Sequence, residues 1–383
     1  MYSENTEDGN ELTKAQNKKK LTLITPGFIS PFKGIHLVFD AIDGLNDVEY
    51  IVAGSVRREL RAHKAYLAKI KKIAPSNVEI IEKFFSMKEF REIIASSDVV
   101  ILPYLDVSQS GSGILHLSLG LGKPIIASKI GEFVELLKGN ALLVDPYDKT
   151  ALRTAISKMK DQKLKQFYES RTRELASKTS WINVSNEHLK IYQDILKKTY
   201  RPMRIAVVST FGERCGIGEY ASFLTNALSQ HDLEVLRIKI SKDWKFGITV
   251  LKTLEKYHPH IVHLQFEYGL FKCFPFFQVG SSILLFYLLS NLFDTKIVTT
   301  LHTVYNPHYL WRKKWKNLIS RITGTFLRVF IMKIITTMSK RLIVHTKEAK
   351  KALLNNNKVI IVRHGTLIEP PKISRAKISR ILS

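Results

Sequence analysis

The chain has 383 residues, of which 45% are hydrophobic, and this is enough apolar material for two packed cores. Its two cysteines, Cys215 and Cys273, are too few for a disulfide framework or a zinc cluster, so a reducing compartment is expected. Residues 1–20 are polar and lack an apolar core region, and we interpret them as a flexible lead rather than a secretory signal.

The formal net charge of +25 is concentrated in the second half of the chain. Residues 1–200 carry 30 basic and 24 acidic side chains, whereas residues 201–383 carry 29 basic and 10 acidic ones. Such a basic half predicts an anionic partner: nucleic acid, anionic lipid or a phosphorylated substrate. No zinc-finger spacing, basic zipper or aromatic ribonucleoprotein signature accompanies the charge, so we do not expect a nucleic-acid partner.

Both halves alternate short apolar runs with helical patterns, which is typical of parallel sheets covered on both faces. Strands are predicted in the first half at 21–25, 49–54, 77–81, 98–104, 123–128 and 140–145, with helices such as 86–96 and 113–121 between them. Strands are predicted in the second half at 203–210, 234–240, 260–265, 296–302, 341–346 and 358–364. The pattern predicts an α/β fold of two Rossmann-like doubly wound domains, 21–200 and 201–383, divided near Pro202.

Glycine-containing loops follow several strands, where such sheets bind ligands. Gly216 and Gly218 precede a helix whose free N–H groups can meet an anion, although a plain tight turn explains them equally well. A dinucleotide site would need an acid at the end of the next strand, and that strand ends without one. In the first half, Gly54 follows the second strand. Lys33 and Gly34 are predicted at a helix start. The lysine either binds a diphosphate together with the helix N–H groups or is simply solvated in a turn.

A further candidate loop is SQSGSG at 108–113, where Ser110, Gly111, Ser112 and Gly113 could present consecutive N–H groups to an anion. His263, His302, His345 and His364 are predicted at strand ends, beside Gln265 and Glu267. A single such histidine is more often structural, and no HxH or HxxxH spacing indicates a metal site.

Both halves resemble the GT-B fold glycosyltransferases of the retaining family-four group. PGFISPFKGIHLVFDAI, SGILHLSLGLGKPIIASKIGEFVELL and the helix SWINVSNEHLKIYQDIL of the first half are similar to the family's C-terminal, donor-binding domain. MRIAVVSTFGERCGIGEYASFLTNAL, HIVHLQFEYGLF, TTLHTVYNPH and VIIVRHGT of the second half are similar to its N-terminal, acceptor-side domain. The two domains therefore stand in reversed order, as a circular permutation or a fusion of two half-enzymes.

The resemblance implies transfer of a sugar from a nucleotide-diphosphate sugar to a glycan or lipid-linked acceptor, with retention and without a metal or other cofactor. His302 matches the family histidine near the donor sugar, and Lys33 the lysine at the diphosphate. Phe85, or its neighbour Phe84, matches the segment that lines the base. Gln265 and Glu267 are expected on the acceptor side.

Three family side chains are replaced. The two family glutamates align with Gln109 and Leu117, and an arginine at the diphosphate aligns with Phe28. The alternative function is therefore a non-catalytic or half-fused glycosyltransferase-like subunit that pairs with a partner half-enzyme. A GT-B sugar-nucleotide epimerase would require more acids in the donor site.

Residues 273–293 carry no charge and are followed by the basic WRKKWK at 311–316. Because they lie between two predicted strands of one sheet, we expect a helix that is partly buried and partly dipped in lipid, rather than a spanning one. This favours a cytoplasmic protein at the anionic inner face of a membrane. A covered core helix with a solvated basic face is an equally good interpretation.

Overall fold

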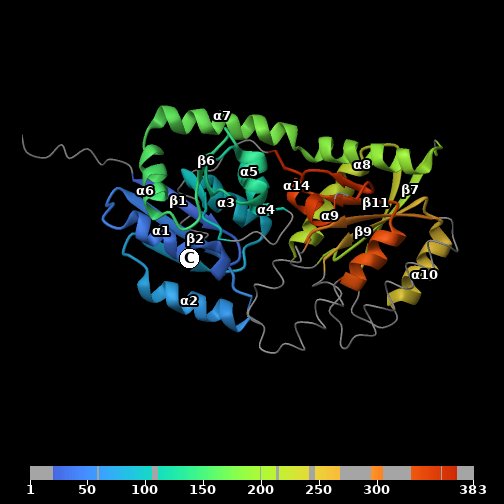
Figure 1. The fold of residues 1–383 in the computed structure, drawn as a ribbon, viewed down its shortest axis with the longest axis horizontal. Coiled ribbons are helices and arrows are strands. Elements are labelled where there is room, and N and C mark those ends of the chain that lie inside the picture. Colours follow the sequence, from blue (N-terminus) through green and yellow to red (C-terminus); the bar gives the residue numbers. More distant parts are fainter. Residues whose placement is uncertain are drawn as a thin grey trace, which may run out of the picture.

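The computed structural model describes residues 20–57, 60–105, 111–198, 200–212, 215–240, 246–267, 295–304, 329–354 and 356–368. They form two parallel six-stranded sheets, each covered by helices, which confirms the predicted α/β class (Figure 1). After the family domains that their sequences resemble, we call the unit around the first sheet the donor-side unit and the unit around the second sheet the acceptor-side unit.

The sheet of the donor-side unit has the strand order β3-β2-β1-β4-β5-β6. Its strands are β1 (Leu21–Pro26), β2 (Val48–Gly54), β3 (Val78–Glu82), β4 (Val99–Leu102), β5 (Ile125–Ser128) and β6 (Leu142–Val144). Its helices are η1 (Pro31–Lys33), α1 (Ile35–Ile42), α2 (Arg61–Ile73), α3 (Met87–Ser96), α4 (Gly113–Gly120), α5 (Gly131–Leu137), α6 (Lys149–Lys158) and α7 (Gln162–Lys178). Every residue of β1, β4 and β5 is buried, which explains why these strands read as continuous apolar runs.

The sheet of the acceptor-side unit has the strand order β12-β11-β10-β9-β7-β8. Its strands are β7 (Met203–Ser209), β8 (Leu233–Lys239), β9 (Ile261–Phe266), β10 (Lys296–Leu301), β11 (Arg341–Val344) and β12 (Val359–Ile361). Its described helices are α9 (Gly216–Leu228), α10 (Phe246–Tyr257), the helix of residues 329–338 and α14 (Lys347–Ala352).

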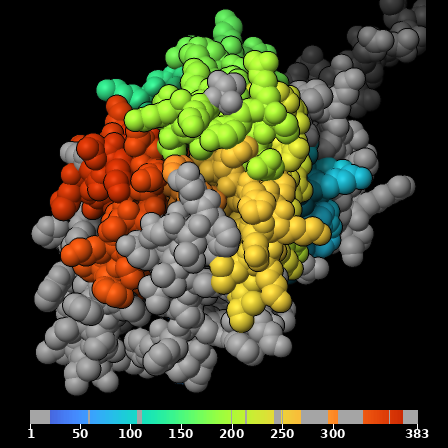
Figure 2. Space-filling model, turned by 90° about the vertical axis from the view of Figure 1, so that its right-hand side faces the viewer, coloured from blue at the N-terminus to red at the C-terminus, as the bar shows by residue number. Residues whose placement is uncertain are grey.

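Helix α8 (Trp181–Leu196) leaves the donor-side unit and packs on the acceptor-side unit. Trp181, Val184 and Tyr192 share one apolar core with residues of β7 and α9. Figure 2 shows α8 in light green across this end of the molecule. By packing, the boundary therefore falls between α7 and α8, whereas the sequence places it near residues 199–204.

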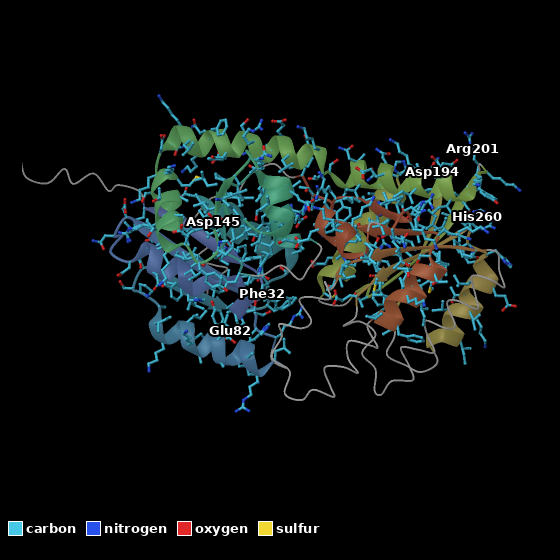
Figure 3. The ribbon with its side chains drawn as sticks, in the orientation of Figure 1. Phe32, Glu82, Asp145, Asp194, Arg201 and His260 are labelled. Atoms are coloured by element: carbon cyan, nitrogen blue, oxygen red, sulfur yellow. The ribbon has the colours of Figure 1, made fainter. Side chains whose placement is uncertain are left out.

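The connection from α8 to β7 lies at the end of the molecule farthest from the donor-side unit. Figure 3 labels Asp194, Arg201 and His260 there, and Phe32, Glu82 and Asp145 in the other unit. Since β7 and β9 start at that far end and all six strands are parallel, the carboxyl ends of the second sheet point back toward the donor-side unit.

The chain returns to the donor-side unit after β12. Thr366 forms a parallel bridge with Ser180, in which its N–H donates to the carbonyl of Thr179 at 2.7 Å. A second contact joins α5 and α14: the Glu135 carboxylate accepts from the N–H of Lys347 at 3.0 Å and from Arg363 Nη1 at 3.0 Å. The units therefore make direct polar contacts at two places.

Within the described residues, no helix combines the length and the apolar character that crossing a bilayer requires. The segments 273–293 and 311–316, on which the membrane prediction rests, lie outside the described residues, as does the lead 1–19. That prediction stays a prediction.

We expect Gly120→Ala to destabilise the contact between the units. A β-carbon at Gly120 would lie 2.0 Å from the carbonyl oxygen of Leu367, so α4 and the returning segment must move apart. Overpacking of this kind costs about 1–3 kcal/mol of the free energy of unfolding, which denaturant titration measures. Gly216→Ala is the matched control, because no atom of the described residues lies within 4 Å of its added carbon. Equal stability of the two variants would contradict the close contact.

Candidate functional site

The loops at the carboxyl ends of the two sheets meet where the units touch. A β-carbon on Gly111, which follows β4, would lie 3.3 Å from Cδ2 of His345, which follows β11. A β-carbon on Gly113 would lie 4.0 Å from Nε2 of His364, which follows β12. The start of α4 is thus brought against the acceptor-side histidines, and the candidate site is built here.

Lys33 ends η1 and is buried, with 6% of its surface exposed. Its ammonium donates to the hydroxyl of Tyr104, and among the described residues no carboxylate forms an ion pair with it. Desolvation lowers the pKa of Lys33 to about 7. An anion beside this lysine would therefore relieve an electrostatic penalty for which no described residue provides a negative charge.

Two of the predicted donor-binding glycines are required by close backbone packing. Gly34 has φ +62°, and a β-carbon there would lie 2.1 Å from the carbonyl oxygen of Pro103. A β-carbon on Gly54 would lie 2.0 Å from the carbonyl oxygen of Gly27. These contacts hold the loop around Lys33 against the ends of β2 and β4, so both glycines shape the site through the backbone.

The sequence predicts free backbone N–H groups at the start of α4, but these groups are not all free. The Ser112 N–H donates to Glu132 Oε2 at 2.7 Å, while the Ser112 hydroxyl accepts from the N–H of Leu115 at 3.3 Å. The amide of Ser112 is therefore already used, which corrects the prediction for this residue. Gly113 is exposed at the helix start, and Gln109 and Ser110 lie outside the described residues.

Glu132 contributes a carboxylate to the start of α4, and the loop sequence SQSGSG at 108–113 contains no acidic residue of its own. Glu132 Oε1 lies 3.1 Å from His116 Nε2, and both side chains are 1% exposed. His116 Nδ1 in turn lies 2.8 Å from the hydroxyl of Thr366 in the acceptor-side unit. Burial raises the pKa of Glu132 and lowers that of His116 to about 3. Sequence reasoning missed this pair because Glu132 lies 20 residues beyond Ser112, on another helix.

In the acceptor-side unit, His302 is oriented by Gln265. His302 Nε2 lies 2.8 Å from Gln265 Oε1, and the amide nitrogen of Gln265 lies 3.2 Å from His263 Nε2. Gln265 and His263 are both fully buried within β9. The structure thus places His263 inside a strand rather than at its end, and Gln265 is buried and bonds His302. The acceptor-side role of Gln265 stays a prediction.

The remaining predicted residues lie at the edge of this site. Thr303 donates to the carboxylate of Glu267, so this acid stands next to His302 at the end of β9. Gly218 allows α9 to approach the carbonyl oxygen of Thr210, which lies 2.5 Å from a β-carbon built on Gly218. In the part of the chain that the structure describes, no atom lies within 4 Å of a β-carbon built on Gly216. Gly216 is therefore the glycine at the open start of α9.

Four aromatic side chains of the acceptor-side unit lie close together, and we call them the ring cluster: Tyr220, His302, His345 and His364. The Tyr220 ring centre lies 4.9 Å from that of His302, 5.3 Å from that of His345 and 5.0 Å from that of His364. His116 of the donor-side unit stacks on His364 at 4.7 Å. Desolvation lowers the pKa of all three cluster histidines, so they are neutral near pH 7. Among the described residues, no three histidine, cysteine or acidic side chains are placed to hold a metal ion.

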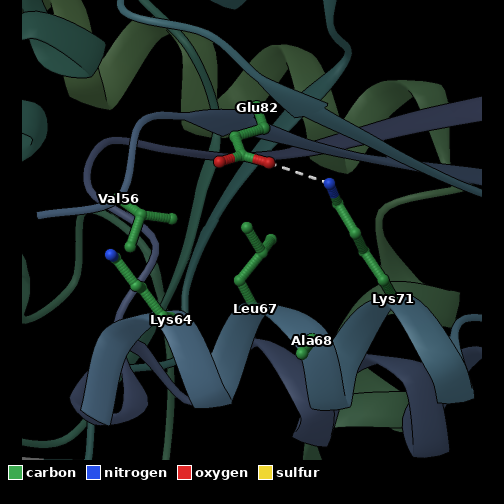
Figure 4. A pocket seen from close by; sticks show the side chains of 6 residues that line it. All are labelled: Val56, Lys64, Leu67, Ala68, Lys71 and Glu82. Atoms are coloured by element: carbon green, nitrogen blue, oxygen red, sulfur yellow. Dashed lines mark hydrogen bonds and ion pairs between the residues drawn. The ribbon is translucent and has the colours of Figure 1, made fainter. Parts of the chain in front are cut away.

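Near the ends of β2 and β3, the exposed aromatic ring is Phe84 rather than Phe85. Phe85 is buried against Phe90, with ring centres 5.4 Å apart, whereas Phe84 is 42% exposed. A pocket of about 430 Å³ lies between these strand ends and α2, where Lys71 pairs with Glu82 at 2.8 Å (Figure 4).

At Phe28, where the family resemblance implies an arginine, a guanidinium is nevertheless close. Arg57 Cζ lies 5.0 Å from the Phe28 ring centre, within the range of a cation–π contact. Arg57, in the segment after β2, thus places a positive charge next to the loop that contains Phe28.

Comparisons with known proteins bear on this geometry. Residues 20–162 match a family model described as glycosyl transferases group 1, and no curated protein matches the chain. The chain is similar to Anabaena Alr3699/HepE in complex with UDP and glucose (20% identity, 42% of this chain and 44% of that chain, TM-score 0.37). It is also similar to sucrose-phosphate synthase from Thermosynechococcus elongatus (15% identity, 48% and 47%, TM-score 0.41).

A third similar structure is the C-terminal domain of a glycosyl transferase group 1 family protein, LpcC, from Francisella tularensis (19% identity, 41% of this chain and 84% of that chain, TM-score 0.35). The matches span less than half of the HepE and synthase chains. The donor-side unit of this protein is thus similar, over residues 20–162, to the family of glycosyl transferases group 1.

Proposed function

We propose that this protein is a glycosyltransferase, of the hexosyltransferase type, that moves a sugar from a nucleotide-diphosphate sugar to a glycan or lipid-linked acceptor. The observation that carries the proposal is the meeting of the α4 start with the ring cluster, which forms one site from both units. The group 1 match of residues 20–162 supports a nucleotide-sugar donor. HepE was solved with UDP-glucose, so UDP-sugars are the first donors to test.

In the proposed reaction the main barrier is departure of the nucleoside diphosphate, because negative charge develops on its oxygens. Lys33 is the buried cation for this charge, and Gly113, an exposed residue at the start of α4, is the second group that we assign to the diphosphate. His302, held by Gln265 at 2.8 Å, faces the sugar in this scheme. We expect retention at the anomeric carbon and no metal requirement.

We also propose that the reversed order of the two units is a permutation within one active enzyme. The bridge between Ser180 and Thr366 and the contact of His116 with Thr366 support this, since both join the two units of a single chain. The alternative, a half-fused subunit that needs a partner half-enzyme, would leave these buried contacts without a role. An acceptor at the anionic inner face of a membrane rests on the sequence of residues 273–293 and 311–316 alone.

Binding stoichiometry tests the proposed function directly. We expect a monodisperse monomer that binds one nucleoside diphosphate per chain, measured by calorimetry with UDP, GDP and ADP and by light scattering. The corresponding nucleotide-sugars should be hydrolysed slowly or transferred. A protein that binds none of these nucleotides, or only after pairing with a second polypeptide, contradicts the proposal.

His302→Ala should lower the rate of sugar transfer or donor hydrolysis by at least about 100-fold, because a positioned polar group at the reacting centre contributes about that much. His302→Gln, which can still reach Gln265, should retain more activity. His231→Ala is the control, since His231 bonds Ser185 away from the site, at 3.0 Å. Full activity of His302→Ala at unchanged melting temperature would refute the assignment.

Donor affinity should depend on pH through Lys33. Its pKa is about 7 without a ligand, and a bound diphosphate raises that pKa by stabilising the ammonium form. Binding therefore takes up a proton, and the affinity for UDP should fall by about tenfold per unit as pH rises above about 7.5. Calorimetry should show that Lys33→Met removes this dependence. Lys123→Met should keep it, because the lowered pKa of that lysine, about 8, belongs to another part of the unit.

A further inference from the structure

His345 presents a hydrogen-bond acceptor that nothing in the described structure uses. Its Nδ1 lies 2.9 Å from the carbonyl oxygen of Val362, and because a carbonyl only accepts, Nδ1 carries the proton. Nε2 of the neutral ring then carries a lone pair. This atom is buried and has no hydrogen-bond partner among the described residues, in a side chain that is 1% exposed.

Tyr220 adds a second unused polar atom to the same cluster. Its hydroxyl is buried without a hydrogen-bond partner among the described residues, and the side chain is 2% exposed. The ring centres of Tyr220 and His345 are 5.3 Å apart. Burying a polar group without a hydrogen-bond partner is unfavourable, so a ligand that pairs with these two atoms gains that compensation.

The position of His345 relates these atoms to the donor. Gly111, two residues before α4, is the donor-side residue packed against the His345 ring, 3.3 Å from the built β-carbon. If the diphosphate lies at Lys33 and Gly113, its sugar comes next in the direction of the acceptor-side unit. His302 and His364 at the same place are only partly buried, so the ring cluster has an open edge.

We propose that His345 and Tyr220 form a subsite for the donor sugar, in which His345 Nε2 accepts a hydrogen bond from a sugar hydroxyl and the Tyr220 hydroxyl bonds a second one. This inference rests on the proposed function and names two contacts for the transferred group.

The chemistry selects a hydroxyl over a phosphate oxygen. A lone pair on a neutral imidazole needs a donor, and the oxygens of an ionised diphosphate have no proton to donate. A sugar carries several hydroxyl groups that both donate and accept. The subsite therefore recognises the sugar and not the nucleotide. Its loss should weaken binding of the nucleotide-sugar and leave binding of the nucleoside diphosphate unchanged.

The test measures by calorimetry the affinity for UDP and the affinity for UDP-glucose. If the wild-type protein prefers GDP or ADP, that nucleotide and its nucleotide-sugar are compared instead. His345→Asn keeps a nitrogen donor at the position of Nδ1 for Val362 but removes the acceptor at Nε2. We expect about tenfold weaker binding of the nucleotide-sugar and unchanged binding of the nucleoside diphosphate. His345→Gln, which places an oxygen near Nε2, should recover most of the loss. Tyr220→Phe should weaken nucleotide-sugar binding severalfold in the same selective way.

His188→Asn is the matched control. His188 Nδ1 also lies on a carbonyl, that of Val184 at 2.8 Å, and its Nε2 has no hydrogen-bond partner among the described residues. His188 packs on His263 within the acceptor-side unit, however. It should leave both affinities unchanged.

The outcomes separate the subsite from the proposed function. Wild type that binds no nucleotide and no nucleotide-sugar overturns the proposed function and the subsite with it. Wild type that binds a nucleotide-sugar while His345→Asn and Tyr220→Phe bind it equally well overturns the subsite alone. Equal loss of nucleoside diphosphate and nucleotide-sugar binding also overturns it, because it indicates a structural role.

Discussion

The hydrogen bond between His116 and Thr366 joins the two halves of the candidate site. This contact of 2.8 Å links α4, whose start faces the ring cluster, to the segment that follows β12. Glu132 holds the other nitrogen of His116 and also the amide of Ser112, so the start of α4 and the position of the acceptor-side unit are set by one chain of contacts. The close approach of Gly120 to Leu367 is possible only because no side chain stands between them.

This arrangement buries ionisable groups that are expensive to remove from water. Lys33 has no ion-pair partner among the described residues, and desolvation is the cause of its lowered pKa. The cluster histidines are neutral for the same reason. Such groups destabilise a fold unless they are paired, and their gathering at a boundary between two units is typical of a binding site. In the proposed function, a diphosphate supplies the charge that pairs with Lys33 and a polyhydroxylated sugar supplies the hydrogen bonds.

The sheets could be predicted because buried parallel strands leave a local signal. The segments DVVILPY and KPIIAS contain the unbroken apolar runs VVILP and PIIA, and the strands β4 and β5 lie in these segments. Lys33, His302, His345 and His364 could be found because they follow or precede such runs. Residues whose role depends on a partner far along the chain could not be found. No role is predicted for Glu132, because its partners Ser112 and His116 lie on another helix, and Gln265, at the end of the predicted strand 260–265, is expected on the acceptor side rather than bonded to His302.

The amino-acid sequence by itself determined the alternation of strands and helices, the two α/β units and the loops that end their strands, because these depend on the period of apolar residues and on local turn chemistry. Only the tertiary structure decided which loops face each other. In the folded protein the Ser112 amide bonds Glu132, and Gln265 points inward and bonds His302. His345 Nε2 and the Tyr220 hydroxyl are left at the boundary without a hydrogen-bond partner among the described residues. The physical reason is that hydrogen bonds across 20 to 250 residues arise from the packing of the two sheets, which no local pattern encodes.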